Sequence, residues 1–137
     1  MKTLVLYYSY SGNTKNVARE AATVESADIA EIFDRSRPGK LRAYTAGIVA
    51  SIRGKAWPIQ PLGVDLSAYD RLIMLSPVWA SNPTPAFNAA LKLLPEGKTV
   101  AIKMISASGK SECKERVESV ITSKGGTLES FEDVMRK

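Results

Sequence analysis

The sequence predicts an α/β fold in which parallel β-strands alternate with α-helices in a doubly wound, five-stranded sheet. Strand-like and helix-like segments alternate along all 137 residues, and such alternation requires crossover connections between parallel strands. Three of the five predicted strands are almost wholly apolar, as are strands covered on both faces. A chain of this length is long enough for one domain with its own core, so we expect residues 1–137 to form a single domain.

The N-terminal half begins with a β-prone run over residues 3–8, followed directly by a helix from residue 15 to 24. Residues 27–33 are β-prone but carry two acidic side chains, which is typical of an edge strand that faces water. After a Pro-Gly turn, apolar residues recur at helical spacing: Leu41, Tyr44, Ile48 and Ile52. This spacing predicts an amphipathic helix over residues 41–53, between basic ends.

In the C-terminal half, residues 56–67 are extended and irregular, and residues 71–75 form a short apolar strand. Thr84 and Pro85 start a helix, as an N-cap followed by proline at the first helical position, and Pro95 ends it. Three further elements follow: a strand over 99–105, a helix over 111–123 and a strand over 127–131. Apolar first, third and fourth strands with a polar second strand fit the strand order 2-1-3-4-5.

The composition excludes several classes of function. The chain has no histidine, which excludes Ser-His-Asp and Cys-His catalysis and the usual zinc hydrolase site, so we expect no catalytic residue and no metal. Its single cysteine, Cys113, excludes an internal disulfide and is expected to pack within the fourth helix. No segment resembles a signal peptide or a membrane span, so a cytoplasmic protein is expected.

The net charge of +5 is concentrated in residues 35–55. No acidic residue occurs between Asp34 and Asp65, whereas six basic residues lie there: Arg35, Arg37, Lys40, Arg42, Arg53 and Lys55. Such a region attracts an acidic redox partner or the phosphate of a nicotinamide cofactor. A nucleic acid or an anionic membrane is a third class of partner, but the region lacks a groove-reading motif and has few aromatic residues. We therefore expect neither nucleic acid nor membrane as the partner.

The first predicted strand ends in Ser9-Tyr10-Ser11-Gly12-Asn13-Thr14 and then opens a helix. A helix N-terminus carries unpaired N–H groups and a partial positive charge, so it stabilises a phosphate. Ser9, Ser11 and Thr14 add hydroxyl donors, Asn13 adds an amide, and Gly12 allows the backbone to bend close to a ligand. The glycine patterns of dinucleotide and nucleoside-triphosphate sites are absent. The alternative is that these residue types serve the turn and the helix cap alone.

The run from Ser9 to Thr14 fits, at every position, the phosphate-loop pattern of the flavodoxin family, and so resembles it. A second segment, residues 76–83, resembles a loop of one branch of the flavodoxin-like flavoproteins, in which it lies along the ribityl chain and the flavin ring. The resemblance covers the chain up to its last strand. It implies a three-layer flavodoxin-like fold that binds FMN, although the fifth helix that normally closes this fold has no counterpart before Lys137.

The same resemblance implies which residues border the flavin. In the second segment, Pro77, Val78 and Trp79 match the family pattern, and tryptophan offers the largest aromatic wall for a flat ring. A lone tryptophan is also often a core residue, and the Pro-rich loop favours the ligand role here. In the family, the loop after the fourth strand borders the pyrimidine side of the flavin. In this chain that loop contains Ser106, Ala107, Ser108 and Gly109.

Three tyrosines and two lysines carry separate expectations. Tyr10 lies within the phosphate loop and is expected to touch the ligand, whereas Tyr7 and Tyr8 are expected in the core of the sheet. Lys110 either places positive charge near the reduced ring or is solvated beside a turn, and both alternatives stay open. Lys103 interrupts an apolar strand, and an unpaired buried ammonium is costly. Either it has a partner or its face of the sheet is not fully covered, and we expect the second, with a homodimer as one way of covering that face.

The leading hypothesis is an FMN-binding flavodoxin-like protein that passes electrons between a reductase and an acceptor. The flavin performs the redox step and the protein contributes orientation and potential, which agrees with a chain that has no evident catalytic dyad. The alternative is an NAD(P)H-dependent FMN or quinone reductase on the same fold, which the basic region favours and the short chain disfavours. The expected partners are accordingly redox proteins or NAD(P)H.

Overall fold

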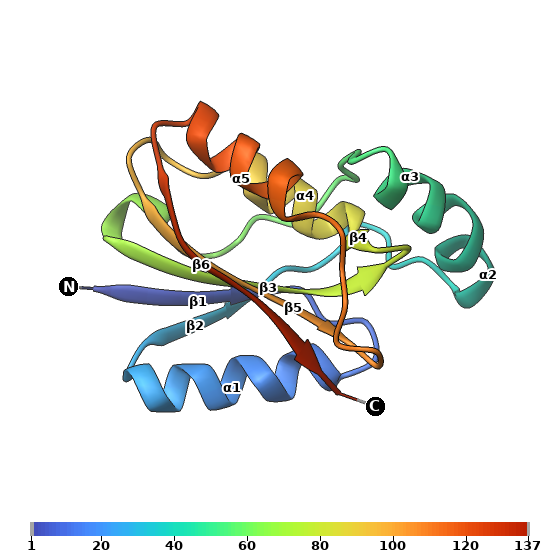
Figure 1. The fold of residues 1–137 in the computed structure, drawn as a ribbon, viewed down its shortest axis with the longest axis horizontal. Helices are drawn as coiled ribbons and strands as arrows, with labels where there is room; N and C mark the ends of the chain where they lie inside the picture. The colour runs from blue at the N-terminus through green and yellow to red at the C-terminus, as the bar shows by residue number, and fades with distance from the viewer. Residues whose placement is uncertain (1, 137) are drawn as a thin grey trace.

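A computed structural model describes residues 2–136 of the chain (Figure 1). Its middle layer is a parallel sheet in the order β2-β1-β3-β5-β6. These strands are β1 (Thr3–Tyr7), β2 (Asp28–Glu31), β3 (Arg71–Trp79), β5 (Thr99–Ser106) and β6 (Thr127–Met135). A two-residue strand, β4 (Asn82–Pro83), pairs with the end of β3 in an antiparallel hairpin. The predicted order 2-1-3-4-5 is therefore confirmed, because β4 adds a hairpin without adding a position to the parallel sheet.

Helices cover the two faces of the sheet unequally (Figure 1). The helix α1 (Asn13–Glu25) lies on one face, and α4 (Pro85–Lys92) and α5 (Lys114–Ser123) lie on the other. The predicted start of α4 is confirmed, since the Thr84 side chain accepts a hydrogen bond from the Phe87 N–H at 3.3 Å. The result is a three-layer arrangement, as predicted for a doubly wound sheet.

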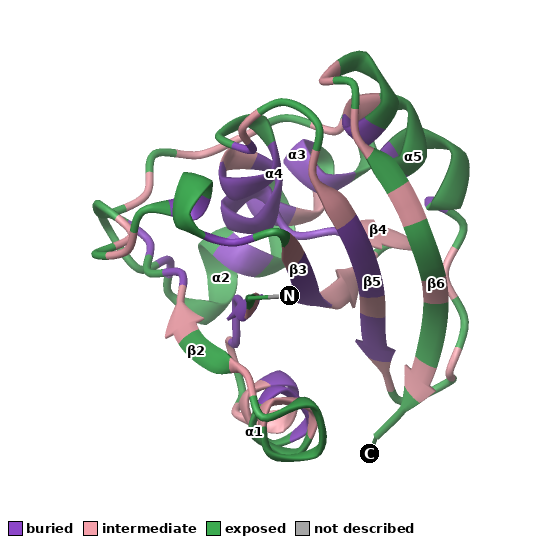
Figure 2. Cartoon of the chain, turned by 90° about the vertical axis from the view of Figure 1, so that its left-hand side faces the viewer, coloured by how far each residue is buried: buried purple, intermediate pink, exposed green. Residues whose placement is uncertain are grey.

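The strand β1 shows how the alternation of side chains builds both layers of the core. Val5 and Tyr7 belong to the apolar cluster beneath α1, whereas Leu4, Leu6 and Tyr8 belong to the larger cluster beneath α4 and α5. All five side chains are buried, which confirms that Tyr7 and Tyr8 are core residues. Both faces of this central strand are therefore apolar, whereas the edge strands β2 and β6 are mostly exposed (Figure 2).

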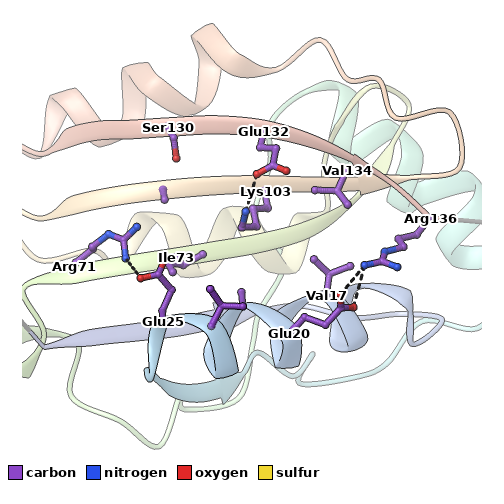
Figure 3. A pocket seen from close by; sticks show the side chains of 13 residues that line it. Val17, Glu20, Glu25, Arg71, Ile73, Lys103, Ser130, Glu132, Val134 and Arg136 are labelled. Carbon is purple, nitrogen blue, oxygen red and sulfur yellow. Dashed lines mark hydrogen bonds and ion pairs between the residues drawn. The ribbon is translucent and has the colours of Figure 1, made fainter.

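Beside α1 the sheet is partly open, and a groove of about 400 Å³ lies against β5 and β6 (Figure 3). Lys103 lies in this groove with its side chain 26% exposed, and its Nζ is 2.7 Å from Oε2 of Glu132 on β6. Two more ion pairs reach α1 across the groove: Arg136 with Glu20, and Arg71 with Glu25. The expectation that the face of the sheet at Lys103 is not fully covered is confirmed, and the alternative holds as well, because Lys103 has a carboxylate partner.

A helical segment of residues 40–52 lies beyond the end of β3, to the right in Figure 1. It consists of α2 (Lys40–Arg42), a π-helical turn η1 (Ala43–Gly47) and α3 (Ile48–Ile52). This confirms the predicted helix over 41–53. An amphipathic helix normally buries its large apolar side chains. Here the buried residues are small: Ala43, Gly47, Ala50 and Ser51. Four large apolar side chains are exposed instead, with exposed fractions of 78% for Leu41, 79% for Tyr44, 47% for Val49 and 50% for Ile52.

Several predicted boundaries were wrong. Residues 76–79, expected in a loop, extend β3 to Trp79, because the following two-residue turn at Ala80 and Ser81 folds the chain back onto it. Cys113, expected within the fourth helix, precedes α5 as its N-cap residue and is buried there, because α5 begins at Lys114 and not at residue 111. The last strand, predicted to end at residue 131, continues to Met135 alongside β5.

The connection between α3 and β3 is irregular, as predicted for residues 56–67, apart from a short 3₁₀ turn η2 (Leu66–Ala68). Within this connection, Ile59 forms an isolated antiparallel β-bridge with Asp34, which holds the segment that follows β2 in place. Among residues 2–136, every helix is too short or too polar to cross a lipid bilayer.

Candidate functional site

The loops that follow β1, β3 and β5 lie at one end of the parallel sheet, where the carboxyl ends of the strands meet (Figure 1). In an open α/β sheet, ligands bind beyond this edge at the point where the strand order reverses. In the observed order β2-β1-β3-β5-β6, that point lies between β1 and β3. The site is therefore built from the loop after β1 and the end of β3.

The loop between β1 and α1 forms an open cradle in front of a helix N-terminus. Gly12 is the N-cap of α1 and has φ 107°, a left-handed conformation that favours glycine. A Cβ at Gly12 would have no atom within 4 Å, so the space in front of it is open. The Ser9 hydroxyl oxygen, on a buried side chain, accepts hydrogen bonds from the N–H groups of Gly12 at 3.1 Å and Lys15 at 3.3 Å. The loop thus holds its shape through Ser9 and leaves the first turn of α1 accessible.

The remaining side chains of the cradle differ in burial: Thr14 is buried, Gly12 and Asn13 are half-buried, and Ser11 is exposed. The first turn of α1 contains no acidic residue, so the partial positive charge of its N-terminus is not neutralised there. A guanidinium adds to this charge, because Arg37 lies 4.5 Å above the ring of Tyr10 and donates a hydrogen bond to the Tyr10 carbonyl oxygen. The cradle is suited to an anion such as a phosphate.

Two aromatic side chains meet beside this cradle. The rings of Tyr10, in the β1–α1 loop, and Trp79, at the end of β3, have centroids 5.6 Å apart and lie at 82° to each other. They line an apolar cavity of about 310 Å³ together with four residues of the helical segment: Lys40, Ala43, Tyr44 and Ile48. A flat aromatic group would find apolar walls here, immediately next to an anion site.

The sequence analysis missed the contribution of Tyr44 and Ile48 to this cavity. Both were recognised as part of a helical apolar stripe, but a stripe alone does not indicate which neighbour a helix will meet. The signal that was available is the set of small residues around them, Ala43, Ala46 and Gly47, which allows close approach to a bulky group. The structure places Gly47 against Trp79, which brings the helical segment over the cavity.

The residues expected near the ligand in β3 and in the β5–α5 loop do not line this cavity. Pro77 and Val78 belong to β3, where they pair with Ile105 and Pro83. The Ser106 hydroxyl accepts hydrogen bonds from the N–H groups of Gly109 at 2.9 Å and Lys110 at 3.2 Å, so it closes its own turn. Ala107, Ser108 and Lys110 are exposed, and Gly109 is half-buried.

The β5–α5 loop is nevertheless joined to the end of β3. The Glu112 N–H donates a hydrogen bond of 2.8 Å to the Ser81 carbonyl oxygen in the β3–β4 turn. Arg116 of α5 then links three elements, donating to the Asn82 side-chain oxygen at 3.0 Å and to the carbonyl oxygens of Ser51 and Ile52. The hairpin that carries Trp79 is thus held from both sides.

A buried carboxyl group lies behind the aromatic pair. Asp34 accepts a hydrogen bond of 2.5 Å from the Tyr8 hydroxyl, and the Tyr8 ring meets Trp79 edge to face, with centroids 6.5 Å apart. Burial raises the pKa of Asp34 above its usual range, and burial with the bond to Asp34 raises the pKa of Tyr8 as well. Burial and a hydrogen bond to Glu31 raise the pKa of Tyr7 to about 12. Both tyrosines therefore stay neutral at physiological pH.

No protein-family model matches the chain, and no curated protein does. Solved structures do match it. A flavoprotein from Lactobacillus acidophilus NCFM, in complex with FMN, is 25% identical, with a TM-score of 0.73 over 95% of this chain and 91% of that one. A flavodoxin, WrbA-like protein from Agrobacterium tumefaciens is 17% identical, with a TM-score of 0.58 over 92% of this chain and 74% of that one.

Oxidised Flavodoxin 1 from Bacillus cereus is 19% identical, with a TM-score of 0.58 over 100% of this chain and 87% of that one. These likenesses extend over nearly the whole chain and agree with the order of the strands in the sheet. The chain therefore has the fold of the flavodoxin-like flavoproteins, which confirms the resemblance that its loop residues indicate.

Proposed function

We propose that the chain binds FMN and acts as an electron-transfer protein. The observation that carries this proposal is the juxtaposition of an anion cradle at Gly12 with the apolar cavity between Tyr10 and Trp79. FMN combines a terminal phosphate with a flat ring system, so these two features match its two ends. The likeness to the Lactobacillus flavoprotein in complex with FMN supports the same cofactor.

In this proposal the backbone N–H groups at the start of α1 and the side chains of Ser11, Asn13 and Thr14 hold the phosphate, and Ser9 shapes the loop. Tyr10 and Trp79 wall the ring and exclude water from one side of it. Residues at the ends of β3 and β5, outside the cavity lining, border the cofactor less directly in this proposal: Pro77, Val78, Ser106, Ala107, Ser108 and Gly109. Bound FMN supplies the redox chemistry, because its ring system accepts and releases electrons.

Electron transfer is favoured over a proton-transfer reaction by the groups around the cavity. The sequence has no histidine, and the nearest buried acid, Asp34, is already engaged by the Tyr8 hydroxyl. Apart from Lys40, the cavity is lined by aromatic, aliphatic and small side chains, which can orient a ring and include no carboxylate or imidazole to act as a general base. The chain therefore contributes binding, orientation and a local electrostatic field.

A second candidate function is an NAD(P)H-dependent FMN or quinone reductase. A polar cavity of about 190 Å³ adjoins the cradle at Ser9 and includes Arg35 and Arg37, which favour a second phosphate group. Glu31 and Asp34 line the same cavity and oppose it. Steady-state oxidation of NADPH with a quinone acceptor separates the two functions, because turnover without an added reductase identifies an enzyme.

FMN and riboflavin titrations test the proposed binding site. Because riboflavin has the same ring system and no phosphate, we expect FMN to bind at least about tenfold more tightly, equivalent to about 1.4 kcal/mol. Saturating FMN should also raise the melting temperature, since a ligand that binds the folded state alone stabilises it. Equal affinity for both flavins would exclude the cradle as the phosphate site, and no binding of either would exclude the function.

A further inference from the structure

The region beside the cavity combines fixed positive charge with exposed apolar side chains. Residues 35–55 carry six basic residues and no acidic residue, and the rest of the chain has a net charge of −1. All six basic side chains are exposed. The excess positive charge of the whole chain is thus presented by one segment, which wraps around the end of the sheet where the flavin is proposed to bind.

Two of these arginines are held in place by aromatic rings. The Arg37 guanidinium lies 4.5 Å above the ring of Tyr10, and the Arg42 guanidinium lies 4.6 Å above the ring of Trp57. Contact with a ring restrains a guanidinium and leaves N–H groups at its edges available, apart from the one that Arg37 donates to the Tyr10 carbonyl oxygen. A planar, preorganised guanidinium is suited to a carboxylate, which it binds with two parallel hydrogen bonds.

The apolar side chains of this segment point outward. Leu41, Val49 and Ile52 are between 47% and 78% exposed, while the segment buries its small residues. Thirteen helical residues span about 20 Å at about 1.5 Å per residue, which is enough for the small interfaces of transient electron-transfer complexes. Exposed apolar groups ringed by charge are typical of a protein–protein contact.

We propose that the outward side of residues 35–55, here called the basic docking surface, binds an acidic protein that exchanges electrons with the flavin. The inference rests on the proposed function, and it names the partner by its charge. Arg37, Arg42, Arg53 and Lys55 attract carboxylates, and Leu41, Val49 and Ile52 supply the apolar contact. In each encounter one electron leaves the reduced partner, which is oxidised, and enters the flavin, which is reduced.

A protein is favoured over an anionic lipid surface by the geometry of the charges. Lipid-binding helices keep flexible basic side chains that reach headgroups in many arrangements. Here two guanidiniums are stacked on rings and cannot follow a fluid surface without losing that contact. The surface also adjoins Lys40 and Tyr44 of the cavity, so a bound protein comes close to the ring system.

The test measures electron transfer by stopped flow between the FMN-loaded protein and a reduced plant-type [2Fe–2S] ferredoxin, which is a small acidic protein. Between 10 and 300 mM salt the rate should fall about tenfold, because salt screens long-range attraction. Basic cytochrome c, used as an acceptor for the reduced protein, should show the opposite salt dependence. A ferredoxin rate that does not change with salt would overturn the proposal.

Charge-neutralised variants locate the surface. The triple variant Arg42→Gln/Arg53→Gln/Lys55→Gln should lower the ferredoxin rate about fivefold at low salt, since steering depends on local charge. The matched control Arg19→Gln/Lys92→Gln/Lys114→Gln removes the same charge from exposed positions of α1, α4 and α5 and should change the rate less than about twofold. Equal losses in both variants would overturn the proposal, because only net charge would matter.

Failure of this inference is distinguishable from failure of the proposed function. FMN titration and reduction of the flavin by dithionite do not depend on the docking surface. If FMN binds and is reduced by dithionite but the ferredoxin rate does not change with salt, the docking site alone is overturned. Absence of FMN binding would overturn both. Sedimentation with phosphatidylglycerol vesicles tests binding to lipid. If the variant Arg42→Gln/Arg53→Gln/Lys55→Gln no longer binds vesicles that the wild type binds, and its ferredoxin rate equals that of the wild type, the surface binds lipid and the proposal is overturned.

Discussion

Gly47 packs directly against the ring of Trp79. A Cβ at Gly47 would lie 2.8 Å from Cζ3 of Trp79, so it would collide with that indole ring, and 3.5 Å from Cη2 of Trp57, which is ordinary van der Waals contact. Glycine inside a helix lowers the stability of the folded state by about 1 kcal/mol relative to alanine. The close approach that it permits brings the helical segment over the cavity between Tyr10 and Trp79, which sets the shape of the proposed flavin site.

Replacement Gly47→Ala should therefore loosen this contact. We expect a free energy of unfolding lower by about 1–3 kcal/mol, because overpacking displaces either the helix or the indole. FMN affinity should fall with it. The matched control is Gly39→Ala, since a Cβ at Gly39 meets no atom within 4 Å and its φ of −69° suits alanine. Urea denaturation of both variants checks the expectation, and equal stability of the two would contradict it.

Replacement Trp79→Ala should weaken FMN binding at least about tenfold, or about 1.4 kcal/mol, by removing the aromatic wall of the cavity. Trp79→Phe should have a smaller effect. Trp57→Ala serves as the control, because Trp57 lies outside the cavity lining and carries the Arg42 guanidinium. The measurement is fluorescence titration of FMN, and an unchanged dissociation constant in Trp79→Ala would remove Trp79 from the site.

The β3–β4 turn is strained at two residues that are not glycine. Ala80 and Ser81 have φ values of 50° and 68°, in the left-handed region that costs roughly 1–2 kcal/mol per residue for side chains with a Cβ. Replacement Ala80→Gly should stabilise the protein by about 0.5–1 kcal/mol and raise its melting temperature by about 2–4 °C. The same exchange in a regular helix, Ala89→Gly in α4, should lower the melting temperature, so the two variants are predicted to differ in sign.

The buried hydroxyl of Ser51 has no hydrogen-bond partner among the described residues. Its Oγ is fully buried near the end of α3. Burying an unpaired hydroxyl is costly, so Ser51→Ala should increase the free energy of unfolding by about 1 kcal/mol. Ser123→Ala, at an exposed position of α5, should change it little. Thermal unfolding checks both variants, and a loss of stability in Ser51→Ala would show that the hydroxyl has a structural role.

The raised pKa of Asp34 leads us to expect a specific dependence of the free energy of unfolding on pH. Burial raises the pKa of this carboxyl in the folded state above its value of about 3.9 in unfolded chains. As the pH rises from that value through the folded-state pKa, the folded protein keeps a proton that the unfolded chain has lost. The stability that the neutral carboxyl contributes is therefore lost over this window.

Asp34→Asn removes that titration and keeps an oxygen that can accept the hydrogen bond from Tyr8. Its stability relative to the wild type should accordingly increase as the pH rises through the window and then level off. Urea denaturation of both proteins at a series of pH values from 3.5 to 7, about one unit apart, measures the difference. Parallel stability curves would contradict the prediction.

The cradle and the sheet order were predictable because their information is local. The spacing of apolar residues identifies strands and helices, and the run from Ser9 to Thr14 shows turn chemistry within six consecutive positions. The β3–β4 hairpin was not predictable, since Ala80 and Ser81 are not the glycine or asparagine that such a turn favours. Pairing with β4 and the hydrogen bond from Glu112 to Ser81 hold that turn instead.

The sequence by itself determined the alternation of strands and helices, the order of the sheet and the position, at its carboxyl edge, of the Ser9–Thr14 loop that we propose binds a phosphate. The tertiary structure decided which face of the 40–52 segment is buried, because the indoles of Trp79 and Trp57 leave room for small residues alone. It thereby brought Tyr44 beside Tyr10 and left Leu41 and Ile52 on the surface. A contact between residues more than thirty positions apart depends on the packing of whole elements, which local periodicity does not encode.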